Sequence, residues 1–164
     1  MHAQHAKGVR GFTLIELLVV VAVAAVLLAV ALPNLQPQVA AASARSTADK
    51  LADALRYARQ YALSTSTLVT FTPSGCGYSV STSAGAQLLS APAGGSSGVS
   101  CQPLGQTVSF LGDGSVSLCT TDAQGKLSCS ALPSTSRPTA TVSGGGVDWK
   151  VQLSSGGVVS TSQS

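Results

Sequence analysis

The chain has 164 residues and a formal net charge of +3, from nine basic and six acidic side chains. A chain of this length can form one modest domain beside a hydrophobic segment, but not two domains. Beyond Leu63 the charges balance, three basic against three acidic, which excludes a strong basic field for a polyanion.

An apolar stretch over residues 12–32 is the most distinctive part of the chain. A helix of this length covers about 30 Å, the thickness of the hydrocarbon core of a bilayer. Pro33 closes the stretch, and Glu16 places a carboxylate inside it. An unpaired charge costs roughly 2.5 to 3.5 kcal/mol at the centre of an inserted helix, and less near its end. Glu16 therefore requires an explanation.

Three interpretations account for this segment. As a plain membrane anchor, it would be oriented by the basic residues before it, and Glu16 would have no role. As a secretory signal peptide, it would be cut after the Ala-Val-Ala of residues 29–31, which again leaves a charge inside the apolar region. As a prepilin segment, it would be cut between Gly11 and Phe12, and the apolar helix would stay on the mature protein. Only the third interpretation uses Glu16.

The hexapeptide G-F-T-L-I-E of residues 11–16, with Pro33 at the end of the apolar run, resembles the N-terminus of type IV pilins and type II secretion pseudopilins. The resemblance implies that residues 1–11 are a leader, that a prepilin peptidase cuts after Gly11, and that the new N-terminal Phe12 is methylated. It also implies that residues 12–32 are a transmembrane and assembly helix.

The chemistry of the new N-terminus suits Glu16. Cleavage would leave a cationic amine on Phe12, four residues before Glu16, at a helix N-terminus whose free N–H groups and dipole favour a carboxylate. An intramembrane carboxylate is tolerated when it pairs with a cation. The resemblance implies that Glu16 pairs with the N-terminal amine of a neighbouring subunit during fibre assembly.

Both histidines, His2 and His5, lie in the expected leader. The mature chain would then lack the imidazole required for Ser-His-Asp and Cys-His catalysis or for a histidine-ligated metal site. Most acidic residues beyond the helix stand beside Gly or Thr, as is typical of turns. We therefore expect no enzyme activity, no cofactor and no metal site.

Residues 33–63 predict an amphipathic continuation of the helix. Pro33 removes a backbone donor and clashes with the preceding turn, so we expect a kink or a boundary there. Small and apolar residues then recur at spacings of three and four, which marks one helical face for packing on a sheet. These residues are Ala48, Leu51, Leu55, Ala58 and Ala62. Charged residues on the other faces, Arg56 and Arg59 among them, indicate a solvated surface.

After residue 63 Ser, Thr and Gly dominate, and short alternating runs predict strands. The predicted strands are 67–72, 78–82, 106–111, 115–120, 126–131, 147–153 and 158–161. Residues 94–98 and 133–138 predict loops. The fold class is therefore α+β, a long N-terminal helix packed on a C-terminal antiparallel sheet domain of residues 64–164. The resemblance makes it a type IV pilin-like fold.

The four cysteines, Cys76, Cys101, Cys119 and Cys129, all follow the apolar segment, so export would bring them into an oxidising compartment. Residues 122–126 suit a three-residue hairpin loop, and its register sets Cys119 opposite Cys129 with Cα atoms about 4.5 Å apart. We predict a Cys119–Cys129 disulfide, which leaves Cys76 for Cys101. A link from Cys76 to either hairpin cysteine would contradict this pairing.

Weaker patterns narrow the resemblance to the GspH/FimT family of minor pilins. They are the helix end at residues 49–63, the strand and Asp-Gly turn at 108–115, and the last hairpin at 149–159.

Some members of that family bind DNA through an Arg after the glycine of the last hairpin. Here Gly157 is followed by two valines. Lys and Arg contacts to phosphate supply most nonspecific DNA affinity, so nucleic-acid binding is not expected. The residues that could make weak DNA contacts are Lys126, Arg137 and Lys150.

The resemblance implies a minor pilin or pseudopilin, held in the bacterial inner membrane by a single span with its sheet domain in the periplasm. Its partners would be other pilins or pseudopilins, the prepilin peptidase and the inner-membrane assembly platform. We expect it to act in fibre initiation or tip assembly of a type II secretion pseudopilus or a type IV pilus. The alternative is a DNA-binding minor pilin for DNA uptake in natural transformation.

Overall fold

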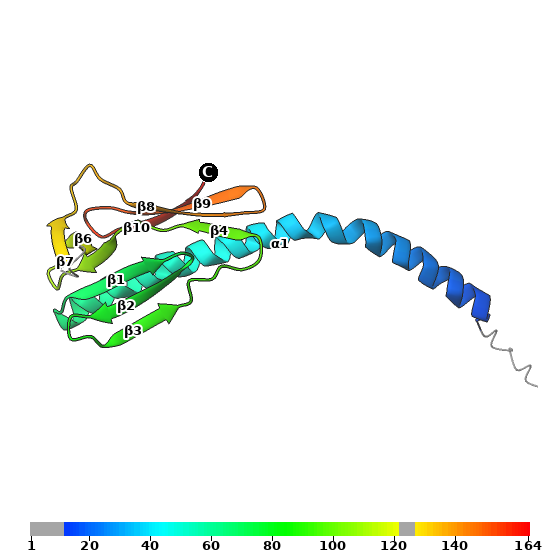
Figure 1. Cartoon of the computed structure of the whole chain (residues 1–164), viewed down its shortest axis with the longest axis horizontal. Coiled ribbons are helices and arrows are strands. Elements are labelled where there is room, and N and C mark those ends of the chain that lie inside the picture. The colour runs from blue at the N-terminus through cyan, green and yellow to red at the C-terminus, as the bar shows by residue number, and fades with distance from the viewer. Residues whose placement is uncertain (1–11, 122–126) are drawn as a thin grey trace, which may run out of the picture. The chain divides into compact units, whose positions relative to one another are not determined.

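The computed structural model describes residues 12–121 and 127–164, apart from the side chains of residues 30–34, 121 and 127. Two compact units meet between Gln36 and Pro37, and each is taken by itself below. The elements are one helix followed by ten strands (Figure 1). They are α1 (Leu14–Thr65), β1 (Val69–Ser74), β2 (Gly77–Thr82), β3 (Gln87–Ala91), β4 (Val99–Gln102), β5 (Thr107–Phe110), β6 (Val116–Thr121), β7 (Leu127–Ala131), β8 (Thr139–Gly144), β9 (Val147–Leu153) and β10 (Val159–Gln163).

Helix α1 continues without interruption through Pro33 and Pro37. The expectation of a helix boundary at Pro33 is therefore wrong, while a kink at this residue stays a prediction. A proline inside a helix removes one hydrogen bond, but the long Ala- and Leu-rich segments on both sides favour the helical conformation. The helix ends at Thr65, because Ser66 takes up a left-handed conformation with φ of 52°.

The strands form two antiparallel sheets instead of the one that the sequence suggests. The larger sheet has the order β3-β2-β1-β5-β6-β7, and the smaller one the order β10-β9-β8-β4. Three strands, β3, β4 and β8, lie in segments for which no strand was predicted. The α+β class is confirmed, because the helix packs on these antiparallel sheets.

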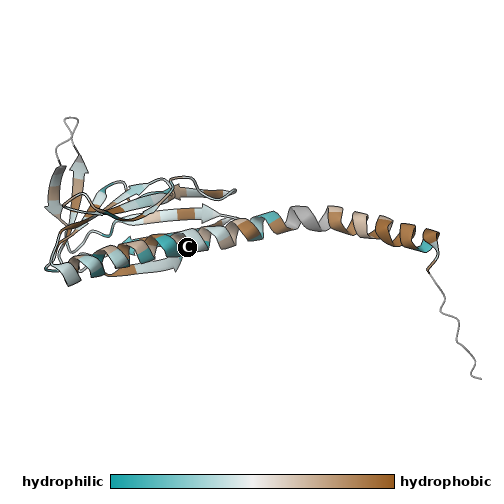
Figure 2. Ribbon diagram, turned by 90° about the horizontal axis from the view of Figure 1, so that it is seen from below, coloured by the Kyte–Doolittle hydropathy of each residue, from teal (hydrophilic) through white to brown (hydrophobic). Residues whose placement is uncertain are grey.

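Both sheets and one face of α1 share a single hydrophobic core. All five residues of the predicted helical face belong to it. Small side chains let the backbones approach closely: a Cβ atom added to Gly144 on β8 would lie 2.6 Å from the carbonyl oxygen of Ala40. The core side of this part of α1 is mostly alanine. Figure 2 shows mixed hydropathy along this part, whereas the N-terminal part of α1 is mostly apolar after its polar first turn.

The two disulfides follow the pairing expected from the sequence. Cys119 on β6 is bonded to its cross-strand neighbour Cys129 on β7, with Cα atoms 4.0 Å apart. The hairpin loop of residues 122–126, from which this register was predicted, lies outside the described residues. The second disulfide joins Cys76, in the turn after β1, to Cys101 on β4. It therefore connects the larger sheet to the smaller one.

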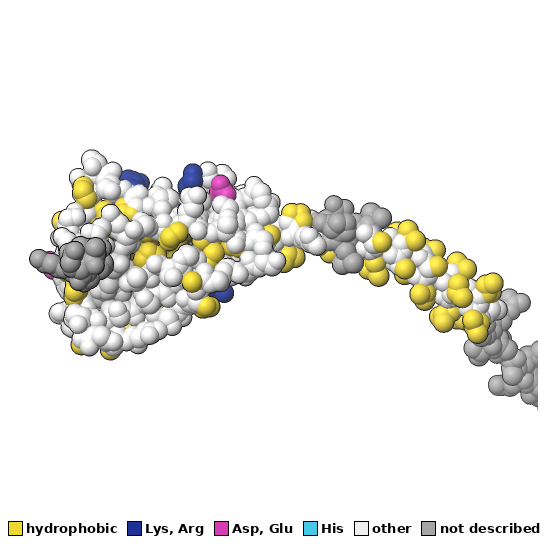
Figure 3. Space-filling view, in the orientation of Figure 1, with side chains coloured by type: hydrophobic (Ala, Val, Ile, Leu, Met, Phe, Trp, Pro, Cys, Tyr) yellow, Lys and Arg dark blue, Asp and Glu magenta, His cyan; other side chains and the backbone are white. Residues whose placement is uncertain are grey.

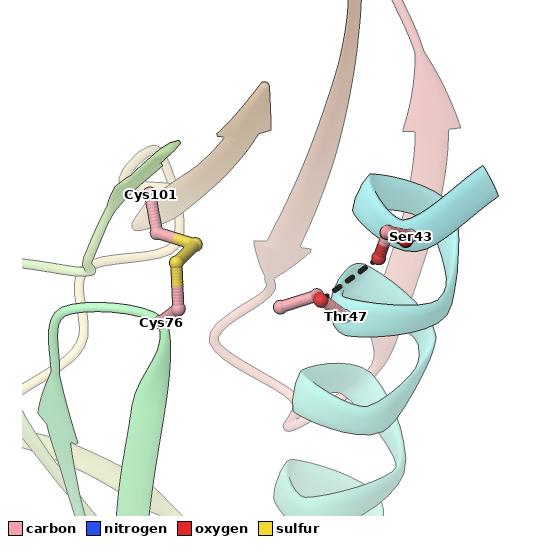
Figure 4. Close-up of a disulfide and its surroundings, with 4 residues drawn as sticks. All are labelled: Ser43, Thr47, Cys76 and Cys101. Carbon is pink, nitrogen blue, oxygen red and sulfur yellow. Dashed lines mark hydrogen bonds between the residues drawn. A yellow bond between two sulfur atoms is a disulfide. The ribbon is translucent and has the colours of Figure 1, made fainter. Parts of the chain in front are cut away.

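The inter-sheet disulfide lies close to α1. Thr47 on the helix lines the same small cavity as Cys76 and Cys101. Figure 4 shows the Thr47 hydroxyl donating a hydrogen bond to the carbonyl oxygen of Ser43, at 2.8 Å. Closing a loop of 25 residues removes conformational freedom from the unfolded chain and stabilises the fold by about 3 kcal/mol in the chain-entropy model.

We predict that Leu55→Ala lowers the free energy of unfolding by about 2 to 5 kcal/mol, because Leu55 is fully buried between the helix and the sheets. Urea unfolding of the detergent-solubilised full chain, followed by Trp149 fluorescence, measures the change. Leu63→Ala is the matched control, since Leu63 lies on the same helix but is 43% exposed. Equal losses for the two variants would contradict the assigned core.

Candidate assembly site

The N-terminus of α1 is fixed by Thr13. Thr13 directly precedes the first helical residue, and its Oγ1 accepts a hydrogen bond from the backbone N–H of Glu16 at 3.3 Å. The spacing Thr-x-x-Glu is that of a capping box, in which the hydroxyl accepts from an N–H group at the helix start. Here the same N–H also donates to the carbonyl oxygen of Thr13 at 3.1 Å, so the hydroxyl and the carbonyl share it. Thr13 is a site residue that the sequence-based predictions missed, although this spacing is the signal for it.

The cap places Glu16 in the first turn of the helix, one turn from Phe12. The positive end of the helix dipole there favours a carboxylate. Among residues 12–121 and 127–164, the ion pairs are Arg45 with Asp49 and Arg56 with Asp53, so none of the described basic side chains pairs with Glu16. Phe12 and Glu16 are both exposed. Phe12 and Glu16 therefore both lie at the start of α1 with their side chains uncovered, and their expected role in assembly stays a prediction.

A continuous apolar surface follows the cap. Every described side chain from residue 12 to residue 29 is exposed, and most of them are Leu, Val, Ile or Ala. Figure 3 shows hydrophobic side chains gathered along this part of α1. An exposed apolar surface of this extent marks a site that contacts another protein or a lipid phase.

The predicted span over residues 12–32 includes three residues, 30–32, whose side chains are not described. Within the described part of the chain, no helix combines the length and the apolar character needed to cross a membrane.

Two of the three residues considered for weak DNA contacts are described, and they lie in different segments of the sheet domain. Lys126 lies outside the described residues. Arg137 is exposed in the segment between β7 and β8. Lys150 lies on β9 and donates a hydrogen bond to the hydroxyl of Ser164 at 2.9 Å.

Asp113 has the turn role expected for an acidic residue beside glycines. Its carboxylate accepts a hydrogen bond from the backbone N–H of Ser115 at 2.9 Å. Hydrogen bonds from Ser115 hold the pKa of the Asp113 carboxyl below its usual value. Among the described residues, no group of three His, Cys, Asp or Glu side chains is placed to hold a metal ion.

Comparison with known protein families agrees with this arrangement. Residues 6–32 match the prokaryotic N-terminal methylation motif, and residues 47–157 match the type II transport protein GspH. The second match covers more than half of the chain. The chain belongs to the GspH family. Neither a curated protein nor a solved structure matches it.

The two matches to this GspH family member fall on parts of the chain with different physical properties, and residues 33–46 lie between them. The methylation motif covers the capped start of α1 and the exposed apolar surface. The GspH match covers the alanine face of α1 and most of both sheets. The protein is therefore a pseudopilin of the minor pilin type, with a prepilin leader.

We predict that Thr13→Ala weakens the first turn of α1 by about 1 kcal/mol, because the variant loses the hydroxyl that accepts the N–H of Glu16. Hydrogen exchange of the first-turn amides, measured on the detergent-solubilised full chain, should become about fivefold faster. Thr13→Ser keeps the hydroxyl and is the control. Unchanged exchange in Thr13→Ala would show that the cap does not hold this turn.

Proposed function

We propose that this GspH family member is an assembly subunit whose N-terminal helix is kept after maturation and inserted among the helices of other pseudopilins. Prepilin peptidase cuts after Gly11 and methylates Phe12, which removes residues 1–11 as a leader. Residues 12–32 then form a single span of the inner membrane, and residues 33–63 extend the helix to the sheet domain of residues 64–164 in the periplasm.

One observation carries this proposal: a helix start that holds a carboxylate in its first turn and is followed by an exposed apolar surface. Such a surface is stable in a lipid phase or against other apolar helices, but not in water. The carboxylate of Glu16 is stable in the same environment only when a cation neutralises it. A secretory signal or a plain anchor has no use for this combination.

The pairing cation in this proposal is the methylated amine of Phe12 of a neighbouring subunit. The amine keeps its charge after methylation, and at this position it would be drawn from the lipid phase toward a carboxylate. In a medium of low dielectric, the attraction offsets the desolvation of both charges only when the two groups are in direct contact, so the pair also selects one axial offset between subunits. Glu16 therefore sets the register of the fibre in this account.

The periplasmic domain acts by contact with other subunits, not by catalysis. The inter-sheet and cross-strand disulfides suit an oxidising compartment. The family match favours a type II secretion pseudopilus as the fibre. We place the subunit in fibre initiation or at the tip, where a minor subunit contacts the assembly platform and other pseudopilins.

Mass spectrometry of the mature N-terminus tests the maturation step. We expect a chain that begins at Phe12 and carries one methyl group on its amine. A chain that begins at Leu32 would indicate a signal peptide cut after Ala31, and a chain that retains Met1 would indicate a plain anchor. Either result would contradict the proposal.

A charge substitution tests the assembly step. Glu16→Ala should still be cut and methylated but should enter the fibre at least about tenfold less, because removing one partner of a buried ion pair leaves the other charge unpaired. Immunoblotting of sheared fibres, with the membrane fraction as reference, gives the ratio. Glu16→Asp keeps the charge and should retain part of the incorporation. Normal incorporation of Glu16→Ala would contradict the role of Glu16.

A further inference from the structure

A cleft of about 380 Å³ lies in the second unit. One wall is the C-terminal part of α1, with Arg56, Arg59 and Leu63. The other is the turn before β10 and the first residue of that strand, with Gly157, Val158 and Val159. The charged side chains of this part of the helix were expected to form a solvated surface. Two of them, Arg56 and Arg59, instead line the cleft.

Arg59 lies half-buried against the turn, and its Nε–H is buried without a hydrogen-bond partner among the described residues. Gly157 lets the turn lie close against this side chain. Its φ of 73° favours glycine, and a Cβ atom there would lie 2.5 Å from Nε of Arg59. A guanidinium is always charged, and a buried donor without a partner is unfavourable. The Nε–H of Arg59 therefore lacks an acceptor among the described residues, and another molecule could supply one.

The second arginine of the cleft is already neutralised. Nη1 of Arg56 forms an ion pair with Asp53 at 2.8 Å, and Nη2 donates a weaker hydrogen bond to the carbonyl oxygen of Val159 at 3.4 Å. Neither described ion pair of the helix involves Arg59. The cleft therefore offers about one positive charge, not a basic field.

Two exposed apolar side chains border the cleft. Val158 is 61% exposed and Leu63 is 43% exposed. Both are among the most exposed large hydrophobic side chains of the second unit. An arginine beside exposed apolar side chains is the composition of a protein interface centre, in which apolar contact excludes water from the charged group.

We propose that this cleft binds an Asp or Glu side chain of a neighbouring subunit, with the Arg59 guanidinium donating to the carboxylate and with Leu63 and Val158 in contact with the segment around it. The inference rests on the proposed function, because it needs a fibre in which another subunit reaches the cleft. The fork of an arginine matches a carboxylate with two parallel hydrogen bonds, and the free Nε–H of Arg59 is one of the donors required.

A polyanion fits the cleft less well than a single carboxylate. Nonspecific DNA binding draws on several phosphate contacts at once, each from a Lys or Arg. Here one of the two arginines is paired with Asp53, and Leu63 and Val158 would meet a hydrated phosphate backbone. One uncompensated cation with apolar neighbours is complementary to one carboxylate on a protein surface.

A photo-crosslinker tests the proposal in the assembled fibre. p-Benzoyl-phenylalanine replaces Val158 in the full chain, cells are irradiated while fibres assemble, and the crosslinked peptide is identified by mass spectrometry. We expect a peptide of another subunit that contains an Asp or Glu. Arg59→Gln should reduce the yield at least tenfold, and Arg59→Lys, which keeps the charge but not the fork, should reduce it less. Arg137→Gln removes an exposed arginine outside the cleft and should leave the yield unchanged.

A charge exchange completes the test. Arg59→Glu should abolish the crosslink, and replacing the identified acidic residue of the partner by Arg should restore it. A yield that does not depend on Arg59, a crosslinked peptide without a carboxylate, or a crosslink to nucleic acid would each overturn the inference. Incorporation into fibres of the chain that carries the crosslinker at Val158 and no other substitution is measured in the same cells. If that chain enters fibres normally, these results overturn the cleft alone, whereas its absence from fibres would overturn the proposed function as well.

Discussion

The buried alanine face of α1 is the contact on which the second unit depends. Alanine side chains allow the helix backbone to lie close to two sheets at once, and Gly144 on β8 gives the matching space on the sheet side. Larger residues on either side would force the layers apart and open voids around Leu55. The disulfide between Cys76 and Cys101 then limits how far the two sheets can separate. The arginines of the helix lie outside this closely packed face.

The N-terminal part of the same helix has an exposed apolar surface instead of a packed one. The side chains of residues 14–29 are all exposed, so no other described part of the chain covers them. Among the described residues, the Thr13 cap and the helix dipole are what act on Glu16 there. A surface of this kind requires other molecules, and the carboxylate limits them to partners that bring a cation. The proposed assembly role rests on this uncovered surface, and the proposed Arg59 cleft would add a contact made by the sheet domain.

Local patterns in the sequence predicted much of this arrangement. The spacing of Ala48, Leu51 and Leu55 gave the buried helical face, and the hairpin register gave the Cys119–Cys129 disulfide. Strands β3 and β4 were missed because they have only five and four residues, and β4 is held by pairing with β8, a segment far along the chain. Strand β8 was missed although its six residues alternate between polar and apolar side chains up to Gly144. The cleft was missed for the same reason: nothing near Arg59 in sequence indicates that Gly157 lies against it.

The central claim is that Glu16 is neutralised by the N-terminal amine of another subunit. The most direct measurement is an electron cryomicroscopy map of the assembled fibre at a resolution that shows side chains. The account predicts that the Glu16 carboxylate lies within about 3 Å of the methylated Phe12 amine of a neighbouring subunit. A Glu16 side chain that faces lipid or water with no amine near it, or a fibre in which the subunit lacks its apolar helix, would contradict the account.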